Sequence, residues 1–569
     1  MRVSLGLVVI TDLIVRSTAL TVFYGDQGVY PLSLLYTGWR GEWAWSLHLL
    51  GGGPLPYLIG IFVIHGIAAF CMMIGYRTRT ATFVTWFLMV SLHNANSSVL
   101  QGGDDIFRSL LFIGIFLPWG SVFSVDQAFR YRIDTAKRVV SGWTAAVLLQ
   151  MAMLYFFAVL FKHAPDWATQ GSAVYYALSI NQMVTPIGVS LLQFPKLLQF
   201  LTFTIFGFQH VVPLLLFFPY RTNDVRSLTL IALVIMHISF SLCLQIGLFS
   251  WIMISGLVAF LPSEFWDGLS SLLQKKFGGI AVYYDGECGF CRNLAWVLYT
   301  FFALPNSRVL TAQTDASILA DMRTYDSWVV VSPNQSRHIE FDAVIALVAA
   351  SPIFFVFTPL LRIHRVSRIG RMLYRYIANR RPKVCIPEQV EQTQRLQKVR
   401  LYLTTIIAIS YITYLILWNI TMEPVLNPYI MMPSSWNVVA KIFRFDQNWS
   451  LFAPYPTREG GWYVMSGTLK DGRVIDIFRN GNPVSYTQPT DAASLYSNER
   501  WRKYMMNLGR KSVTKESFAR ILCTRWNSTH DSTLRVIHLE IILMSKPTPP
   551  PGQPFPIPKK VSIVTYECT

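Results

Sequence analysis

Two cysteines three positions apart, Cys288 and Cys291, are the residues of this chain best placed to do chemistry, because it has only seven cysteines in 569 residues. They follow a β-like run (Gly279–Tyr284) and precede a helix-like run (Asn293–Phe302). This setting predicts that Cys288 lies at a helix N-terminus, where free amides and the helix dipole favour a thiolate, the form that attacks disulfides. Cys291, one turn further on, would resolve a mixed disulfide. The spacing therefore predicts a redox dithiol.

A zinc site is the alternative for the same pair, since Cys-x-x-Cys supplies half of a four-ligand site. No second Cys-x-x-Cys exists and Cys385 stands alone, so we favour the redox interpretation and predict no metal site. Cys71 and Cys243 lie in apolar stretches, and we interpret them as packing residues. Cys523 and Cys568 would form a disulfide only if their region is external and their side chains meet.

The elements around the dithiol are mostly apolar helices. The composition is 52% hydrophobic and 14% charged, against about 25% charged in an average soluble protein. Several stretches approach the ~20 residues that cross a bilayer: 3–23, 55–74, 81–92, 106–122, 139–161, 197–218, 228–244, 248–260 and 401–420. The sequence therefore predicts a polytopic α-helical membrane bundle of about nine spans.

These stretches divide the chain into four regions. We predict a helical bundle over 1–264, an inserted α/β domain with the dithiol over 278–385, a last span over 401–420, and a C-terminal α+β domain over 421–569. Within the insert, 343–361 is apolar enough to imitate a span, but its prolines and the arginines that follow favour a buried or interfacial helix pair. Apolar and polar residues alternate over 534–541, which predicts a strand. The Asp471-Gly472 pair predicts the turn of a hairpin.

Basic residues give the orientation. The loops on the side of the N-terminus are rich in lysine and arginine, whereas the opposite loops near the spans hold only Arg40, Lys162 and Lys196. The positive-inside rule then predicts that the N-terminus and the dithiol are cytoplasmic and that the C-terminal domain is external. A net charge of +18 is explained by contact with anionic membrane lipids, so we expect no nucleic-acid partner.

The stretch Tyr284–Cys291 (YDGECGFC) resembles the signature of the DCC family of thiol–disulfide oxidoreductases, and Tyr376–Arg380 resembles that family's closing helix. The resemblance implies a thioredoxin-like fold for the insert and protein-disulfide reductase activity, with Cys288 attacking and Cys291 resolving. Thioredoxin-like folds usually present a cis-proline opposite the dithiol, and Pro333 is the candidate here.

The flanking regions resemble the HTTM family, the membrane domain shared with vitamin K-dependent γ-carboxylases. The matching segments in the bundle are Tyr24–Pro31, Gly75–Arg79, Gly102–Asp104, Phe116–Gly120 and Ser124–Asp126. Further along, Trp449–Pro454 and Asn498–Arg502 look like the external region of bacterial HTTM–DCC fusions. The resemblance implies an integral protein of a bacterial inner membrane.

One HTTM segment bears on chemistry. Tyr155–Ala158 and the residues that follow resemble the carboxylase stretch that contains its catalytic lysine, which falls on Lys162. The resemblance implies that Lys162, once desolvated, is the base that activates a reduced membrane quinone. The alternative is a lysine that snorkels to the interface. A carboxylase histidine falls near Asn96, with His93 close by, so the chain departs from the carboxylase pattern there.

Two classes of function follow. The first is a membrane-anchored thiol–disulfide oxidoreductase that acts on a thiol or disulfide substrate, protein or small molecule, and is coupled to quinone-dependent chemistry at Lys162. The predicted topology places Lys162 and the dithiol on opposite sides, about 30 Å apart, so the quinone would have to diffuse between them. The second is a non-enzymatic scaffold or maturation factor that binds a client through its C-terminal domain. A Cys288→Ser variant separates the two, because only the first class loses its function.

Overall fold

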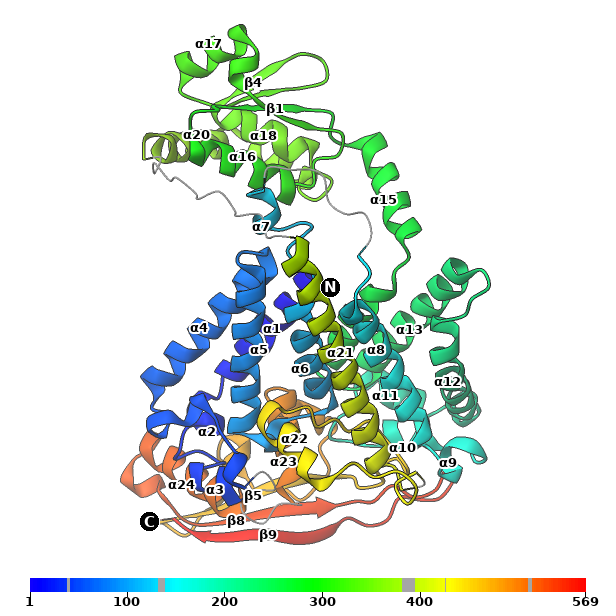
Figure 1. Ribbon diagram of the computed structural model, residues 1–569. Helices are drawn as coiled ribbons and strands as arrows, with labels where there is room; N and C mark the ends of the chain where they lie inside the picture. Colours follow the sequence, from blue (N-terminus) through cyan, green and yellow to red (C-terminus); the bar gives the residue numbers. More distant parts are fainter. Residues whose placement is uncertain (38–40, 131–138, 381–393, 425, 510–513, 569) are drawn as a thin grey trace.

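Figure 1 shows the computed structural model, in which a helical bundle lies between an α/β unit and a β-rich C-terminal region. The structure describes residues 1–569 except 38–40, 131–138, 381–393, 425, 510–513 and 569. The α/β unit caps one end of the bundle, and the C-terminal sheet closes the other end. The bundle thus lies between two regions that contain β-sheets.

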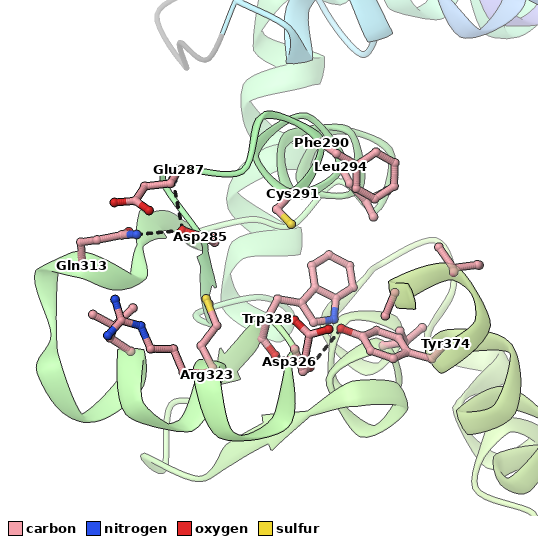
Figure 2. Close-up of a pocket in the computed structure, with 16 residues that line it drawn as sticks. Asp285, Glu287, Phe290, Cys291, Leu294, Gln313, Arg323, Asp326, Trp328 and Tyr374 are labelled. Carbon is pink, nitrogen blue, oxygen red and sulfur yellow. Dashed lines mark hydrogen bonds between the residues drawn. The ribbon is translucent and has the colours of Figure 1, made fainter. Parts of the chain in front are cut away.

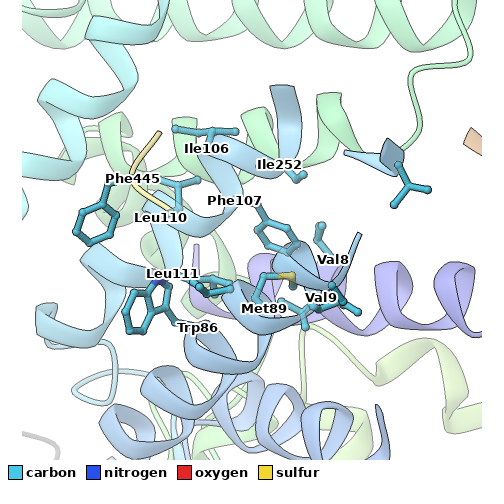
Figure 3. Packing of buried hydrophobic residues seen from close by; sticks show 14 of the residues in the cluster. Val8, Val9, Trp86, Met89, Ile106, Phe107, Leu110, Leu111, Ile252 and Phe445 are labelled. Atoms are coloured by element: carbon cyan, nitrogen blue, oxygen red, sulfur yellow. The ribbon is translucent and has the colours of Figure 1, made fainter. Parts of the chain in front are cut away.

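The bundle is built from apolar helices that pack in chain order, α1 against α4, α4 against α5 and α5 against α6, while α21 returns from far along the chain to pack against α8. Their bounds are α1 (Arg2–Ser17), α4 (Leu55–Ile74), α5 (Thr78–Ala95), α6 (Gly102–Phe116), α8 (Gly142–Leu160), α12 (Pro195–Leu216), α13 (Thr222–Cys243), α14 (Phe249–Leu257) and α21 (Gln394–Met422). Figure 3 shows the centre of this core, where Val9, Met89 and Phe107 from three of these helices meet and are fully buried.

Five of the described helices are long and apolar enough to cross a membrane: α4, α8, α12, α13 and α21. A sixth arises if α14 and α15 (Ser263–Lys276), which are bent by 92° at a short break, count as one span. The predicted number of nine is not confirmed. The predicted span 3–23 is split into α1 and α2 (Leu20–Tyr24), and α1 and α6 each bury ionised side chains that form contacts inside the bundle.

The α/β unit has a mixed sheet of order β2-β1-β3-β4, in which β1 and β2 are parallel and β3 runs antiparallel to both of its neighbours. Along the chain the elements are β1 (Ala281–Tyr284), α16 (Gly289–Phe301), β2 (Arg308–Thr311), α17 (Ala316–Tyr325), β3 (Val329–Val331), β4 (Arg337–Ile339), α18 (Glu340–Ala350) and α20 (His364–Asn379). Adjacent residues Val329 and Val330 face opposite sides of the sheet and join different core clusters. Helices α16, α18 and α20 lie on the side of the sheet toward the bundle, and α17 lies on the other side (Figure 1).

The apolar stretch 343–361 belongs to this unit. Its first half is α18, which buries Ala343 and Leu347 against the sheet core, as the prediction of a buried helix required. Its second half contains a 3₁₀ turn (Phe355–Phe357) and α19 (Thr358–Leu361), so it is too broken to form a span. Pro352 and Pro359 explain the breaks, because proline cannot continue a helix from the preceding turn.

The C-terminal region forms an antiparallel sheet of order β7-β6-β5-β8-β9. Its strands are β5 (Gly461–Leu469), β6 (Val474–Asp476), β7 (Asn482–Pro483), β8 (Val536–Ser545) and β9 (Lys559–Glu567). The predicted hairpin joins β5 to β6 through Asp471-Gly472, where Gly472 has a φ of +86°. Helices α23 (Glu499–Leu508) and α24 (Lys515–Thr529) pack beside the sheet, and Cys523 forms the anticipated disulfide with Cys568.

Candidate redox site and membrane cavity

Cys288 is the residue that caps the N-terminus of α16, directly after the turn that follows β1. Its Sγ accepts a hydrogen bond from the backbone amide of Cys291 at 3.2 Å, and both cysteines are half-buried. The predicted strand–turn–helix setting is therefore confirmed. A backbone amide from the first turn of α16 therefore points at the sulfur that the sequence predicts to be the nucleophile.

The turn before Cys288 is held by a side chain from the neighbouring strand. Gln313, just after β2, donates to the Asp285 carboxylate at 2.8 Å and accepts the amide of Gly286 at 3.0 Å. The same carboxylate accepts the amide of Glu287 at 3.1 Å. We did not predict Gln313, although its position gives a signal: β1 and β2 are parallel, so the residues after both strands meet at one edge of the sheet.

A pocket of about 310 Å³ opens beside Cys291 (Figure 2). In Figure 2 the Cys291 side chain points toward the indole of Trp328, and Tyr374 from α20 lies next to that indole. Charged side chains also line the pocket, among them Glu287, Arg323 and Asp326. The pocket is thus partly aromatic and partly charged, and α20, the predicted closing helix, forms one of its walls.

The expected cis-proline is absent from this site. In the described residues the one cis peptide bond precedes Pro454, in the C-terminal region, so the assignment of Pro333 was wrong. The strand direction gives the reason: β3 is antiparallel to β1, which puts Trp328, before β3, at the edge that carries the dithiol. Pro333, after β3, lies at the opposite edge near Gly279.

No third ligand accompanies the two cysteines among the described residues; Cys385, the residue weighed for a zinc site, lies outside them. The only described grouping with metal-ligand geometry is Asp12, His93 and Asp104 in the bundle. Arginines occupy it: Arg16 contacts both carboxylates, at 2.7 Å and 3.0 Å. The grouping is therefore an ion-pair network.

Lys162 lies two residues beyond the end of α8, and its side chain is only 5% exposed. Its Nζ donates to the carbonyl oxygen of Ala158 at 2.9 Å and to Oε1 of Gln209 at 3.1 Å, and lies 5.0 Å from the centre of the Trp167 ring. Burial lowers the pKa of Lys162 to about 7. The side chain is turned inward, so the alternative of a snorkelling lysine does not describe it.

Lys162 lines a cavity of about 570 Å³ between α8, α12, α13 and the C-terminal region. In its wall the hydroxyl of Tyr155 pairs with Nε2 of His237 at 2.9 Å. His237, which lies in the predicted span 228–244, is therefore a hydrogen-bonded residue of the bundle, and it also lines the cavity. Neither Asn96 nor His93, the positions near the carboxylase histidine, lines it.

Comparisons with known proteins assign the two parts of the chain that contain these residues to two domain families. A family model for the HTTM domain matches residues 43–266, and one for the DCC1-like thiol-disulfide oxidoreductase matches residues 282–386. The chain joins an HTTM domain to a DCC1-like domain. Both resemblances found in the sequence are thereby confirmed. Neither the search of curated proteins nor the search of solved structures found a match.

The two sites belong to different domains. The DCC1-like domain contains Cys288 and Cys291 with their pocket, and the HTTM domain contains Lys162 and most of its cavity. The HTTM cavity is completed by the C-terminal region through residues such as Phe452 and Arg502. In Figure 1 the C-terminal sheet and the DCC1-like domain lie at opposite ends of the bundle.

Proposed function

We propose that the chain is a membrane-anchored thiol–disulfide oxidoreductase whose catalytic residues are Cys288 and Cys291. The Cys288 thiolate attacks a substrate disulfide, forms a mixed disulfide and releases one substrate thiol. Cys291 then attacks Cys288 and releases the second thiol, so that the substrate gains two electrons and the enzyme becomes a disulfide. The observation that carries this proposal is the Cys291 amide held 3.2 Å from the Cys288 sulfur at the start of α16.

The topology of the DCC1-like domain supports the same chemistry. A sheet of order β2-β1-β3-β4 with β3 antiparallel, and with the dithiol between β1 and the following helix, is the arrangement expected of a thioredoxin-like domain. The pocket beside Cys291 is large enough for a small disulfide or for one side chain of a protein substrate. Protein and small-molecule substrates are both compatible with it.

The distribution of cysteines supports the proposed orientation. Among the described residues of the DCC1-like domain, Cys288 and Cys291 form no disulfide, whereas the C-terminal region at the other end of the bundle has the Cys523–Cys568 disulfide. Disulfides persist on the oxidising side of a membrane and are rare in the cytosol. A cytoplasmic dithiol and an external C-terminal region, in a bacterial inner membrane, satisfy this rule together with the positive-inside distribution.

A trapping experiment tests the proposal. In a Cys291→Ser variant the mixed disulfide on Cys288 cannot be resolved, so mass spectrometry of the full-length protein from cells should find a disulfide-linked adduct on Cys288. Cys288→Ser should trap nothing, and Cys71→Ser, which removes a free cysteine of the bundle, should behave like the wild type. If Cys291→Ser shows no adduct and Cys288→Ser keeps full cellular function, the non-enzymatic scaffold is the better explanation.

A second activity is favoured by the Lys162 cavity. We propose that the HTTM domain also binds a membrane quinone there. Three features of the cavity suit a quinone. Its walls are apolar, and its few polar groups include Gln209 and the Tyr155–His237 pair. Lys162 has a pKa of about 7, which suits a base. A reduced quinone would supply an acidic hydroxyl, and Lys162 would accept its proton. Extraction of quinone from purified wild type, but not from a Lys162→Met variant, is the expected result.

A further inference from the structure

The charged side chains that line the HTTM cavity are all basic. Lys162 and Arg502 contribute basic groups, whereas no aspartate or glutamate is found among the described residues that line it. Most of the remaining lining is apolar, from α8, α12 and α13. Basic groups at an apolar cavity without acidic partners favour a ligand that brings its own negative charge.

Arg502 is the strongest sign of such a ligand. It projects from α23 of the C-terminal region and is only 3% exposed, yet its Nε has no hydrogen-bond partner. Its Nη1 contacts the sulfur of Met506 at 3.1 Å, and within the described chain no carboxylate oxygen lies within 4.0 Å of the guanidinium. Burial lowers the pKa of Arg502 to about 10, against the opposing effect of Glu499.

The neighbouring arginine on the same helix provides the comparison. Arg500 is equally buried and its Nε also lacks a hydrogen-bond partner, but its two terminal nitrogens contact Asp12 at 2.7 Å and Asp104 at 2.6 Å. Of the two arginines of α23, at positions 500 and 502, one thus points into an ion-pair network and the other toward the cavity. A buried guanidinium is costly unless it is paired, so the missing partner of Arg502 is expected from outside the chain.

The surroundings of the cavity indicate the rest of the ligand. Helices α12 and α13 both qualify as membrane spans, and they expose large apolar side chains, including Phe203 and Ile235, on their outer surfaces. The cavity between them therefore lies next to the lipid chains. A ligand that reaches it from the membrane would carry a hydrocarbon chain, with a polar group at the end that meets the C-terminal region.

We propose that the HTTM cavity binds a long-chain anionic amphiphile, with its carboxylate or phosphate on Arg502 and its hydrocarbon chain along the apolar walls. This site is independent of the dithiol chemistry. The cavity is the same one that we propose for the quinone, so the two ligands would compete for it. They differ in one testable property, because a quinone is neutral and this ligand has a permanent negative charge. A free fatty acid and an anionic phospholipid share the required chemistry.

Equilibrium binding to the full-length protein in an uncharged detergent tests the proposal. The probes are radiolabelled oleate, oleyl alcohol, which has the same chain without the charge, and dioleoyl phosphatidic acid. We expect oleate or phosphatidic acid to bind at least tenfold more tightly than oleyl alcohol. Preference for oleate indicates a fatty acid as the source, and preference for phosphatidic acid indicates a membrane phospholipid.

Three variants locate the site. Arg502→Gln should weaken binding of the anionic probe at least tenfold and leave oleyl alcohol unchanged, whereas Arg525→Gln, at an exposed position of the same region, should change neither. Ala177→Phe, which fills the cavity, should weaken both probes. Equal binding of oleate and oleyl alcohol by the wild type would overturn the proposal even if every variant misfolded. Undiminished oleate binding by a folded Arg502→Gln variant would do so as well.

Discussion

Arg500 should hold the C-terminal region onto the bundle. Its guanidinium makes three contacts of 2.9 Å or less with the carboxylates of Asp12 and Asp104, all of them buried. Arg16 pairs with the same two carboxylates from the other side. Among Asp12, Asp104, Arg16 and Arg500, two positive and two negative charges therefore balance, and the Glu499 carboxylate lies 3.9 Å from the Nε of Arg500 at the edge of this group. An Arg500→Gln substitution leaves one buried negative charge uncompensated, which costs about 3–5 kcal/mol.

That cost should appear as undocking of α23. A loss of about 3–5 kcal/mol raises the population of the undocked state by a factor of roughly 10² to 10⁴. When opening is fast relative to cleavage, trypsin digestion in detergent reports this population, because the peptide bond after Lys503 lies within helix α23 and can enter the protease only in the open form. We expect Arg500→Gln to be cleaved at least a hundredfold faster than the wild type, and Arg525→Gln to be cleaved at the wild-type rate.

A second substitution distinguishes charge balance from loss of packing. Asp12→Asn in the Arg500→Gln background leaves Asp104 opposite Arg16, so the site is again neutral. The double variant should be cleaved more slowly than Arg500→Gln alone, with a coupling of about 1–3 kcal/mol in the double-mutant cycle. If the double variant is cleaved as fast as the sum of the two single effects predicts, the electrostatic explanation is refuted.

Three further outcomes are expected. Burial lowers the pKa of Lys162 from 10.5 to about 7, so between pH 7 and 10.5 the unfolded chain binds this proton more tightly than the folded chain. The stability of the folded protein, measured by thermal unfolding, should therefore rise with pH across that window, and should rise less steeply in a Lys162→Met variant. Any reaction rate that needs the neutral amine should increase as the pH rises through about 7. Replacing Cys523 and Cys568 by alanine removes a cross-link between residues 45 positions apart and should lower the free energy of unfolding by about 4 kcal/mol. Unfolding of the wild type and of this variant, with and without reductant, measures the difference. Trp328→Ala should lower the rate of disulfide reduction about tenfold by removing a wall of the pocket beside Cys291, while Cys288 alkylates at the wild-type rate.

Local signals in the sequence predicted the elements well. The second predicted span, 55–74, coincides with α4, and the turn at Asp471-Gly472 joins β5 to β6 as expected. Each feature depends only on residues that are adjacent in the chain. For α4 these form an unbroken apolar run, and for the turn they include a glycine with positive φ. The setting of Cys288 was equally local, since a strand, a turn and a helix start are adjacent in the chain.

Contacts between distant segments could not be predicted in the same way. Trp328 rather than Pro333 faces the dithiol because β3 runs antiparallel to β1, and no sequence pattern gave that direction. Arg500 completes the ion pairs of Asp12 from hundreds of positions later in the chain, and no local pattern identifies such a partner. The pairing of His237 with Tyr155, on another helix, is non-local in the same way.

The arrangement of the two sites constrains how they can cooperate. The dithiol lies in the domain at one end of the bundle, while the Lys162 cavity is closed at the other end by Phe452 and Arg502 of the C-terminal region. Direct exchange between the Cys288 sulfur and a ligand in the cavity is therefore ruled out in this conformation, and electrons would have to travel on a carrier that moves through the membrane. Since nothing in the cavity depends on the DCC1-like domain, a Lys162→Met variant should retain the complete dithiol half-reaction. Loss of that half-reaction would mean that the two sites are coupled through the protein itself, and the carrier would be unnecessary.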